Sequence, residues 1–146
     1  MTMREQLLLK NQLCFPLYAA SKAVTRLYAP YLAPYRLTYT QYIALLVLFE
    51  HDGLTVKELG KAMHLDSGTL SPLLEKLETR GFVKKEEGED KREKRLFLTI
   101  QGKAMEDRLA SIPEKIGTCL RLNQEEAVLL YELSYRLLDQ LEENHE

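Results

Sequence analysis

The sequence predicts a mainly α-helical protein that carries one small two-stranded β-wing, and three observations support this fold class. Most of the chain has apolar residues three and four positions apart, which is the spacing of amphipathic helices. Residues 82–99 instead place two short apolar runs around a polar centre, which is typical of a β-hairpin. Two short helical patterns, joined by a turn of about three or four residues, stand directly before this hairpin. Together these patterns predict a winged helix-turn-helix flanked by a helical dimerisation region.

Charge is unevenly distributed along the chain, although the composition is that of an ordinary single domain. The 146 residues are 45% apolar and carry a formal net charge of −2, which is not the charge of a strongly basic nucleic-acid binder. From Lys76 to Arg95, eight basic residues stand against six acidic ones, whereas from Gln124 to Glu146 one arginine stands against seven acidic residues. Attraction to DNA is therefore expected only in the middle of the chain.

No feature of the sequence predicts secretion, a membrane span or a bound cofactor. The first residues lack the apolar core and cleavage site of a signal peptide, and no apolar run reaches about 18 residues, so we expect a cytoplasmic protein without a membrane partner. The three histidines have no metal-ligand spacing, so no metal site is predicted. In a reducing compartment, Cys14 and Cys119 are expected to be buried apolar residues or redox-active thiols, not a permanent disulfide.

The first third of the chain predicts two helices separated by a proline-containing break. Residues from about 5 to 28 have the spacing of one long helix, in which Pro16 removes a backbone hydrogen bond and is expected to cause a kink. Pro30 and Pro34 are expected to break the chain into a short, turn-rich segment. A T-x-x-Q capping box at residues 38–41 then starts a helix that is apolar on most sides.

The next segment matches a helix-turn-helix. A T-x-x-E capping box at residues 55–58 starts a short helix with one apolar face. Asp66 or Ser67 is expected to cap the second helix, which ends near Gly81, a good residue for a left-handed C-terminal cap. Pro72 is expected in the first turn of this helix, where a missing N–H costs little.

The second helix of such a unit lies in the major groove of DNA, with its N-terminal residues at base edges. The residues at this position are small and polar, which allows the helix to approach closely. The candidate DNA-binding residues of this recognition helix are Ser67, Gly68, Thr69, Ser71 and Lys76.

The hairpin that follows is predicted to form the wing. Its strands, residues 82–85 and 95–99, enclose a polar tip with one glycine. A long basic tip reaches phosphates or a minor groove, where arginine is favoured, and its candidate DNA-binding residues are Asp90, Lys91, Arg92, Lys94 and Arg95. The alternative is a solvated charged loop, because acidic residues dilute the positive charge. The preceding helix-turn-helix favours DNA contact.

Helices are predicted again after the wing. Thr99 is expected to cap a helix over residues 100–120, which Pro113 kinks or splits. Asn123 and Glu126 are expected to cap a final helix, in which leucines recur every four residues.

The long helices at both ends of the chain predict the domain organisation. Residues 1–36 and 100–146 are expected to form a helical dimerisation region, and residues 37–99 a winged helix-turn-helix DNA-binding lobe. Paired helix-turn-helix units bind half-sites about one helical turn apart, so a homodimer is expected. Its predicted partner is double-stranded, pseudo-palindromic operator DNA.

This order of elements resembles the MarR family of bacterial transcription regulators over nearly the whole chain. The resemblance is carried by LTVKELGKAMHLDSGTLSPLLEKLETRGFV and by a D-x-R wing, Asp90 and Arg92, which implies that Arg92 is the wing-tip arginine. Within the family, the chain more specifically resembles the organic hydroperoxide resistance regulator branch. This resemblance is carried by the segments NQLCFPLYAASKAVTRLY, LTYTQYIALLVLFEHDGLTVKELG and LDSGTLSPLL.

Similarity to this branch implies roles for both cysteines and for three tyrosines. Cys14 matches the peroxide-sensing cysteine of the first helix. Cys119 matches the resolving cysteine of the two-cysteine type, which forms a disulfide between subunits. Tyr28 and Tyr39 match tyrosines with which the partner subunit holds the sensing thiol, and Tyr18 matches a tyrosine near the site.

The resulting interpretation is a homodimeric DNA-binding repressor, not an enzyme, that releases its operator when organic hydroperoxide oxidises Cys14. Peroxide attacks the thiolate, which hydrogen bonds from phenol groups favour, and gives a sulfenic acid that condenses with a second thiol. Two alternatives remain at this point. One is a MarR-type repressor controlled by a small phenolic or apolar ligand, and the other is a thiol peroxidase that uses Cys14 and Cys119 as its pair.

Overall fold

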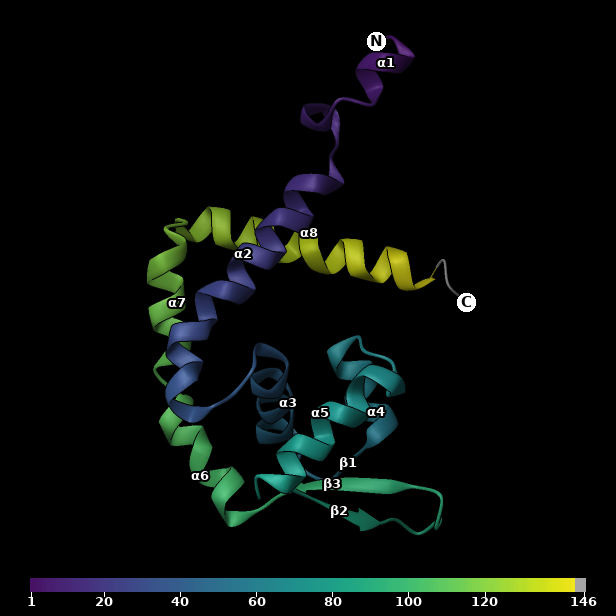
Figure 1. Ribbon diagram of the computed structural model, residues 1–146, viewed down its shortest axis with the longest axis vertical. Coiled ribbons are helices and arrows are strands. Elements are labelled where there is room, and N and C mark those ends of the chain that lie inside the picture. Colours follow the sequence, from purple (N-terminus) through teal and green to yellow (C-terminus); the bar gives the residue numbers. More distant parts are fainter. Residues whose placement is uncertain (144–146) are drawn as a thin grey trace. The chain divides into compact units, whose positions relative to one another are not determined.

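The computed structural model describes residues 1–143 and consists mainly of helices with one small sheet (Figure 1). In chain order the elements are α1 (Met3–Gln6), a 3-10 turn (Leu9–Asn11), α2 (Cys14–Leu32), a 3-10 turn (Ala33–Tyr35), α3 (Tyr39–Glu50), β1 (Leu54–Thr55), α4 (Val56–Met63), α5 (Ser67–Thr79), β2 (Val83–Glu87), β3 (Lys94–Leu98), α6 (Ile100–Leu109), α7 (Ile112–Leu120) and α8 (Gln124–Glu143). The chain divides into two compact units, residues 1–110 and residues 111–146. Within residues 1–143, no helix combines the length and apolarity needed to cross a membrane.

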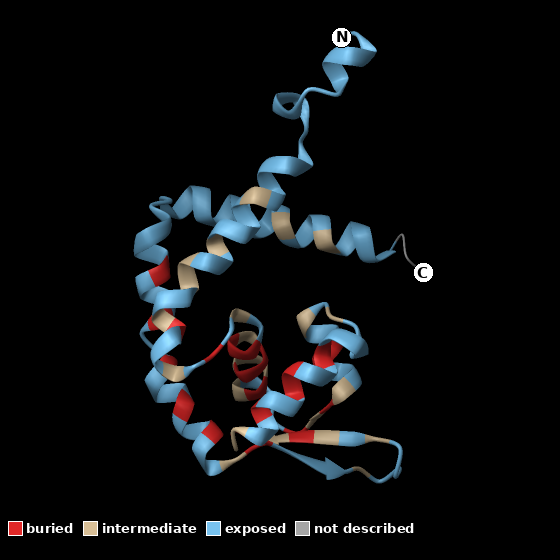
Figure 2. Cartoon of the chain, in the orientation of Figure 1, coloured by how far each residue is buried: buried red, intermediate tan, exposed pale blue. Residues whose placement is uncertain are grey.

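The core of the first unit lies among α3, α4, α5 and the sheet, where the buried residues gather (Figure 2). The prediction that the helix after the Thr38–Gln41 capping box is apolar on most sides is confirmed, because α3 buries residues on several faces. Leucines of the helix-turn-helix complete this core. The fully buried leucines are Leu32, Leu45, Leu48, Leu59, Leu70, Leu74, Leu77 and Leu96.

The helix-turn-helix forms as predicted. The Thr55 hydroxyl accepts a hydrogen bond from the Glu58 N–H at 3.1 Å, and the Glu58 carboxylate accepts one from the Thr55 N–H at 2.9 Å. Asp66, the first of the two expected caps, begins α5 by accepting a hydrogen bond from the Thr69 N–H at 2.8 Å. The turn is tight at Gly60, where a Cβ atom would lie 2.9 Å from the Leu65 carbonyl oxygen.

The recognition helix α5 ends at a left-handed glycine, as predicted. Gly81 has φ +78°, its N–H donates to the Glu78 carbonyl, and the Phe82 N–H donates to the Leu77 carbonyl. These two bonds form a Schellman motif, which satisfies carbonyls at the helix end. The prediction for Pro72 was wrong, because it occupies the sixth position of α5 and not the first turn.

The sheet has the predicted two-stranded wing and a third strand that the sequence analysis did not identify. The strand order is β1-β3-β2, with both pairings antiparallel. β2 pairs with β3 from Val83 opposite Leu98 to Glu87 opposite Lys94. β1 has two residues and pairs with β3 through Leu54 and Leu96, so the start of the helix-turn-helix is fixed to the wing.

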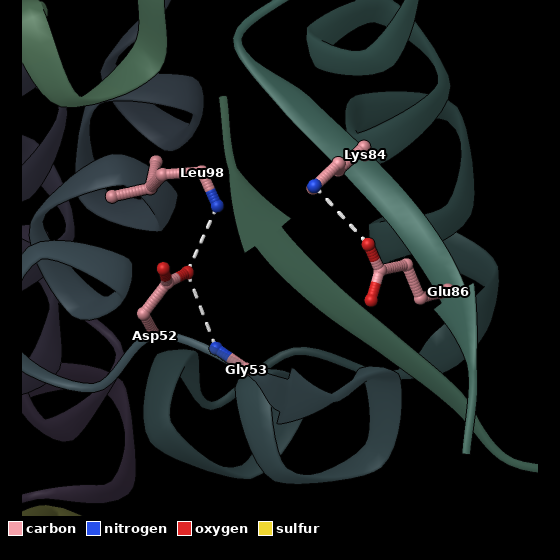
Figure 3. A network of polar contacts seen from close by, with 5 residues as sticks. All are labelled: Asp52, Gly53, Lys84, Glu86 and Leu98. Atoms are coloured by element: carbon pink, nitrogen blue, oxygen red, sulfur yellow. Dashed lines mark hydrogen bonds and ion pairs between the residues drawn. The ribbon is translucent and has the colours of Figure 1, made fainter. Parts of the chain in front are cut away.

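A short polar network fixes the base of the wing to the end of α3. The Asp52 carboxylate accepts hydrogen bonds from the Leu98 N–H at 2.8 Å and the Gly53 N–H at 3.2 Å (Figure 3). On the other side, the Thr99 hydroxyl donates to the Gly81 carbonyl at 2.5 Å. Helix α5 and both wing strands are therefore held in one hydrogen-bonded frame.

The first predicted helix differs in the structure. The expected single helix over residues 5–28 is interrupted after α1, and α2 starts only at Cys14. Pro16 is the third residue of α2, where its missing N–H would have no intrahelical partner, so the expected kink at Pro16 was wrong. Pro30, expected to break the chain, lies inside α2 near its end.

The helices after the wing follow the prediction in most respects. The Thr99 hydroxyl accepts a hydrogen bond from the Gly102 N–H at 3.0 Å and starts α6. The predicted helix over residues 100–120 is split before Pro113 into α6 and α7. In the second unit, Asn123 and Glu126 each accept a hydrogen bond from the backbone N–H of the other at 2.9 Å, which starts α8.

A glycine permits the close packing of α6 against the wing. A Cβ atom on Gly102 would lie 2.0 Å from the Phe82 carbonyl oxygen, a backbone atom that cannot move away cheaply. We predict that Gly102→Ala lowers the free energy of unfolding by about 3 kcal/mol through overpacking, measured by urea denaturation. Gly117→Ala is the matched control, because nothing lies within 4 Å of a Cβ atom there, and it should be neutral or stabilising by up to about 1 kcal/mol. Equal effects of the two substitutions would contradict this account.

Candidate functional site

A cleft of about 900 Å³ lies between the helix-turn-helix and the wing. Its walls come from the end of β1, from α4, from the start of α5 and from the wing tip. The lining residues are Thr55, Val56, Lys57, Gly60, Leu65, Ser67, Leu70, Asp90, Arg92, Glu93 and Lys94. The fold thus brings one predicted recognition-helix residue and three predicted wing residues to the same concave surface.

The predicted residues of the recognition helix differ in how they are presented. Ser67, Gly68 and Thr69 form the exposed first turn of α5, next to the cleft. The Ser71 hydroxyl donates back to the Ser67 carbonyl at 2.8 Å, so its proton is used within the helix. Lys76 is exposed in the last turn of the helix.

A carboxylate stands at the beginning of the recognition helix. The Asp66 side chain accepts the hydrogen bond from the Thr69 N–H, and hydrogen bonding from Thr69, first from its backbone and then from its side chain, lowers the pKa of Asp66. The group therefore remains ionised over the physiological range. It caps the helix, and it adds negative charge beside the surface formed by the first turn of α5.

Ion pairs neutralise part of the positive charge of the wing. Among residues 1–143, its lysines form three pairs: Lys84 with Glu86 at 3.1 Å, Lys94 with Glu87 at 3.9 Å, and Lys85 with Glu78 of α5 at 3.7 Å. Among the described residues, the ammonium of Lys91 and the guanidinium of Arg92 at the tip form no ion pair with a carboxylate. The positive charge available to an anionic partner is therefore concentrated at the end of the hairpin.

The structure separates Arg95 from the other predicted wing residues. Its guanidinium donates a hydrogen bond to the Gly53 carbonyl at 2.9 Å, at the base of the wing, and its side chain is only partly exposed. Asp90, by contrast, shapes the tip, because its carboxylate accepts a hydrogen bond from the Arg92 N–H at 3.1 Å. Arg95 fixes the wing, while Asp90 positions the tip arginine.

The two cysteines lie in different units. Cys14 is the first residue of α2 and is exposed, and Cys119 is exposed in the last turn of α7. Tyr18 lies one turn after Cys14 on α2, with the Lys22 ammonium 4.7 Å from the centre of its ring. Cys14 and Tyr18 are therefore near each other, as predicted, because they lie four positions apart on the same helix.

Three tyrosines form a cluster where α2 packs on α3. The rings of Tyr28 and Tyr39 are 4.8 Å apart between centroids, and the Tyr42 ring is 5.6 Å from Tyr28 and 6.3 Å from Tyr39. Burial raises the pKa of all three, and the neighbouring phenols raise that of Tyr28 further, to about 12. The phenols are therefore protonated hydrogen-bond donors at neutral pH.

The cluster is remote from the thiol of the same chain. Cys14 and Tyr28 stand at opposite parts of α2, fourteen residues apart, which is about 21 Å along a helix axis. A hydrogen bond between them within one chain is excluded by this length. A site that combines Cys14 with Tyr28 and Tyr39 needs the tyrosines of a second subunit.

Sequence analysis missed three residues that organise these regions. Tyr42 completes the tyrosine cluster, and its spacing of three from Tyr39 on a helix was an available signal. Lys57 brings a further positive charge to the cleft from α4. Asp52 accepts the hydrogen bond from the Leu98 N–H across 46 positions of the chain, and no local pattern indicated it.

A helix-turn-helix with an adjoining basic-tipped hairpin defines the winged-helix class of DNA-binding folds. The MarR family model matches residues 37–94, which contain this unit. The organic hydroperoxide resistance transcriptional regulator of Bacillus subtilis is 42% identical over 139 residues, covering 94% of this chain and 92% of that relative. The chain therefore belongs to the MarR family and is a MarR-type transcriptional regulator.

Two solved structures of AbfR, a protein of Staphylococcus epidermidis, are also similar. Reduced AbfR bound to DNA has a TM-score of 0.78 and 33% identity, over 96% of this chain and 99% of that one. Disulfide-formed AbfR has a TM-score of 0.64 and 34% identity, over 95% and 96% of the two chains.

The raised pKa of Tyr28 predicts a stability loss at alkaline pH. An unfolded tyrosine ionises near about pH 10, whereas Tyr28 in the folded protein ionises near about 12. Ionisation then favours the unfolded chain, so the stability is complete below pH 10 and is lost as pH rises toward 12. Tyr28→Phe should lose less stability between pH 9 and pH 11, measured by urea denaturation. A pH dependence identical to that of the wild type would contradict the prediction.

Proposed function

We propose that this protein is a homodimeric repressor that binds a pseudo-palindromic operator and releases it when organic hydroperoxide oxidises Cys14. The observation that carries the proposal is the nearly full-length similarity to an organic hydroperoxide resistance regulator, combined with an exposed Cys14 at the start of α2. The relation to AbfR, which has been solved on DNA and in a disulfide form, supports both parts.

DNA recognition is assigned to the cleft and its margins. The first turn of α5, with Ser67, Gly68 and Thr69, enters the major groove, where small polar side chains allow the backbone to come close to base edges. Arg92 and Lys91 at the wing tip extend to the neighbouring phosphates or minor groove. Lys57 faces the same cleft and adds a phosphate contact. We assign Arg95 a supporting role at the wing base, because its guanidinium is engaged with Gly53.

Dimerisation is assigned to the helical segments 1–36 and 100–146, which leaves residues 37–99 as the DNA-binding lobe. The apolar side chains of α8 support this assignment, because a monomer rarely leaves such a stripe in water. The exposed ones include Leu129, Leu133, Leu137 and Leu141, each between 39% and 57% exposed. The proposed thiol site also requires a dimer, because the length of α2 keeps Tyr28, and Tyr39 beside it, away from Cys14 of the same chain.

The oxidation begins at the sulfur of Cys14. The thiolate attacks one peroxide oxygen, the O–O bond breaks, and the alkoxide leaves and takes up a proton. Sulfur is oxidised to the sulfenic acid, and the hydroperoxide is reduced to the alcohol. The phenol O–H groups of Tyr28 and Tyr39, which burial keeps protonated, donate hydrogen bonds that favour the thiolate before the attack.

The second step involves Cys119 of the partner subunit. Its thiol attacks the sulfenic sulfur of Cys14, an S–S bond forms, and water leaves. A disulfide needs Cα atoms within roughly 7 Å, which fixes the distance between two helices of different subunits. This bridge holds the two recognition helices at a spacing that no longer fits both half-sites. DNA is then released because one of the two half-site contacts is lost.

Arg92→Ala tests the assignment of the wing tip. The probe is a duplex that reduced wild-type protein selects from a random-sequence library. Because the dimer carries two wing tips, loss of one phosphate or minor-groove contact per subunit should weaken binding at least about tenfold and reduce the salt slope by about two, measured by fluorescence anisotropy over several salt concentrations. Arg26→Ala on α2 is the matched control, because it removes the same charge away from the cleft. Equal effects of the two substitutions would remove the wing from the DNA interface.

Serine substitutions separate the two thiols. Reduced Cys14→Ser should bind the selected duplex like the wild type and should keep it after treatment with cumene hydroperoxide. Cys119→Ser should still form a sulfenic acid but should give no reducible dimer band on a non-reducing denaturing gel. Release of DNA from Cys14→Ser by the peroxide would place the sensor elsewhere. A dimer band in Cys119→Ser would remove Cys119 from the bridge.

A further inference from the structure

Arg80 occupies the junction between the recognition helix and the wing. It is the residue that directly follows α5, and its N–H donates to the Lys76 carbonyl, so its backbone continues the helix. Its guanidinium lies over the ring of Phe82, 4.8 Å from the ring centre, directly before the wing strand β2. Arg80 is therefore fixed to α5 and to the wing at the same time.

The same guanidinium also reaches the turn that follows α2, the helix that begins at Cys14. Its two terminal nitrogens donate to the carbonyls of Tyr35 at 2.5 Å and of Arg36, both in the turn that follows α2. Arg36 has the left-handed conformation, with φ +53°, so this turn has a specific shape that orients both carbonyls. A planar fork with several donors suits two adjacent carbonyls in a way that a lysine ammonium does not.

The turn is held from a second side as well. The Tyr35 phenol donates to the Arg108 carbonyl at 3.0 Å, near the end of α6. Leu32, the last residue of α2, is fully buried, so the end of the sensor helix cannot shift without moving its surroundings. The turn that follows α2 is thus joined to α5 and the wing through Arg80, and to α6 through Tyr35.

We propose that Arg80 is the positioning residue that couples the sensor helix α2 to the recognition helix α5. The inference rests on the proposed function, because it concerns how oxidation at one end of α2 reaches DNA. Helix α2 carries Cys14 at its first turn and ends at the turn that Arg80 grips. A displacement of α2 on oxidation therefore moves α5 and the wing together, since both are attached to the same guanidinium.

The test measures the ratio of the dissociation constants of oxidised and reduced protein for the duplex selected by reduced wild-type dimer. Oxidation with cumene hydroperoxide should weaken wild-type binding on the order of 100-fold, within the usual range of allosteric coupling. In Arg80→Met the ratio should fall at least about tenfold, while the rate of Cys14 oxidation, followed by intact mass spectrometry, stays at the wild-type value. Lys61→Met is the control, because Lys61 is exposed on α4 and lies outside the proposed thiol site, the dimerisation region and the cleft lining, and it should keep the wild-type ratio.

Two further variants keep the result decisive. Arg80→Lys retains the charge and one hydrogen bond, so its ratio should lie between the wild type and Arg80→Met even if the latter folds poorly. Tyr35→Phe removes only the bond to Arg108 and should leave most of the coupling. Arg80 variants that weaken reduced and oxidised binding by the same factor would overturn the inference and leave Arg80 merely structural. A wild type whose ratio is one would instead refute the proposed function.

Discussion

The length of α2 is the constraint on which the rest of this account depends. A continuous helix from Cys14 to Leu32 puts the thiol and Tyr28 about 21 Å apart in one chain, while Tyr28 and Tyr39 lie in ring contact. The proposed thiol site would therefore be divided between subunits, which places the proposed oxidation where the subunits meet. A switch at this position would change the spacing between the two recognition helices, and binding to both half-sites of an operator depends on that spacing.

Hydrogen bonds and strand pairing join the helix-turn-helix and the wing into one body. Thr99 bonds to the end of α5, Asp52 bonds to the end of β3, and β1 pairs with β3. Arg80 attaches the turn after α2 to this frame. In the proposed switch, a small displacement of α2 would change the direction of this whole body instead of being absorbed by a flexible wing, because packed elements transmit strain.

Elements whose causes are local in sequence could be predicted. The capping boxes at Thr38 and Thr55, the Asp66 cap and the left-handed Gly81 each depend on residues within a few positions of one another. Pro16 was misinterpreted because a proline can interrupt a helix or stand in its first turn, and the pattern of apolar residues does not distinguish the two. Strand β1 was missed because two residues have no period, and its cause is the distant Leu96.

In the candidate site, too, residues with a local sequence signal could be predicted, and residues that depend on distant contacts could not. The positions of the candidate recognition-helix residues at the start of α5, and of Arg92 at the wing tip, could be predicted because they follow from the order of elements along the chain. Arg80 and the bond from Arg95 to Gly53 depend on contacts across more than one element, for which a single sequence carries no signal. Tyr42 could have been found from its spacing of three from Tyr39 on α3. The predicted pairing of Cys14 with tyrosines of the partner came from family resemblance, and the helix length supplies a physical reason for it.

The most direct measurement titrates the DNA-bound wild-type dimer with cumene hydroperoxide in substoichiometric steps. Intact mass spectrometry gives the fraction of Cys14 oxidised, and fluorescence anisotropy on the same samples gives the fraction of operator duplex released. The account predicts that release follows oxidation of Cys14 and is reversed by a thiol reductant. A protein that keeps its duplex with Cys14 fully oxidised would contradict the account and would favour control by a bound small molecule.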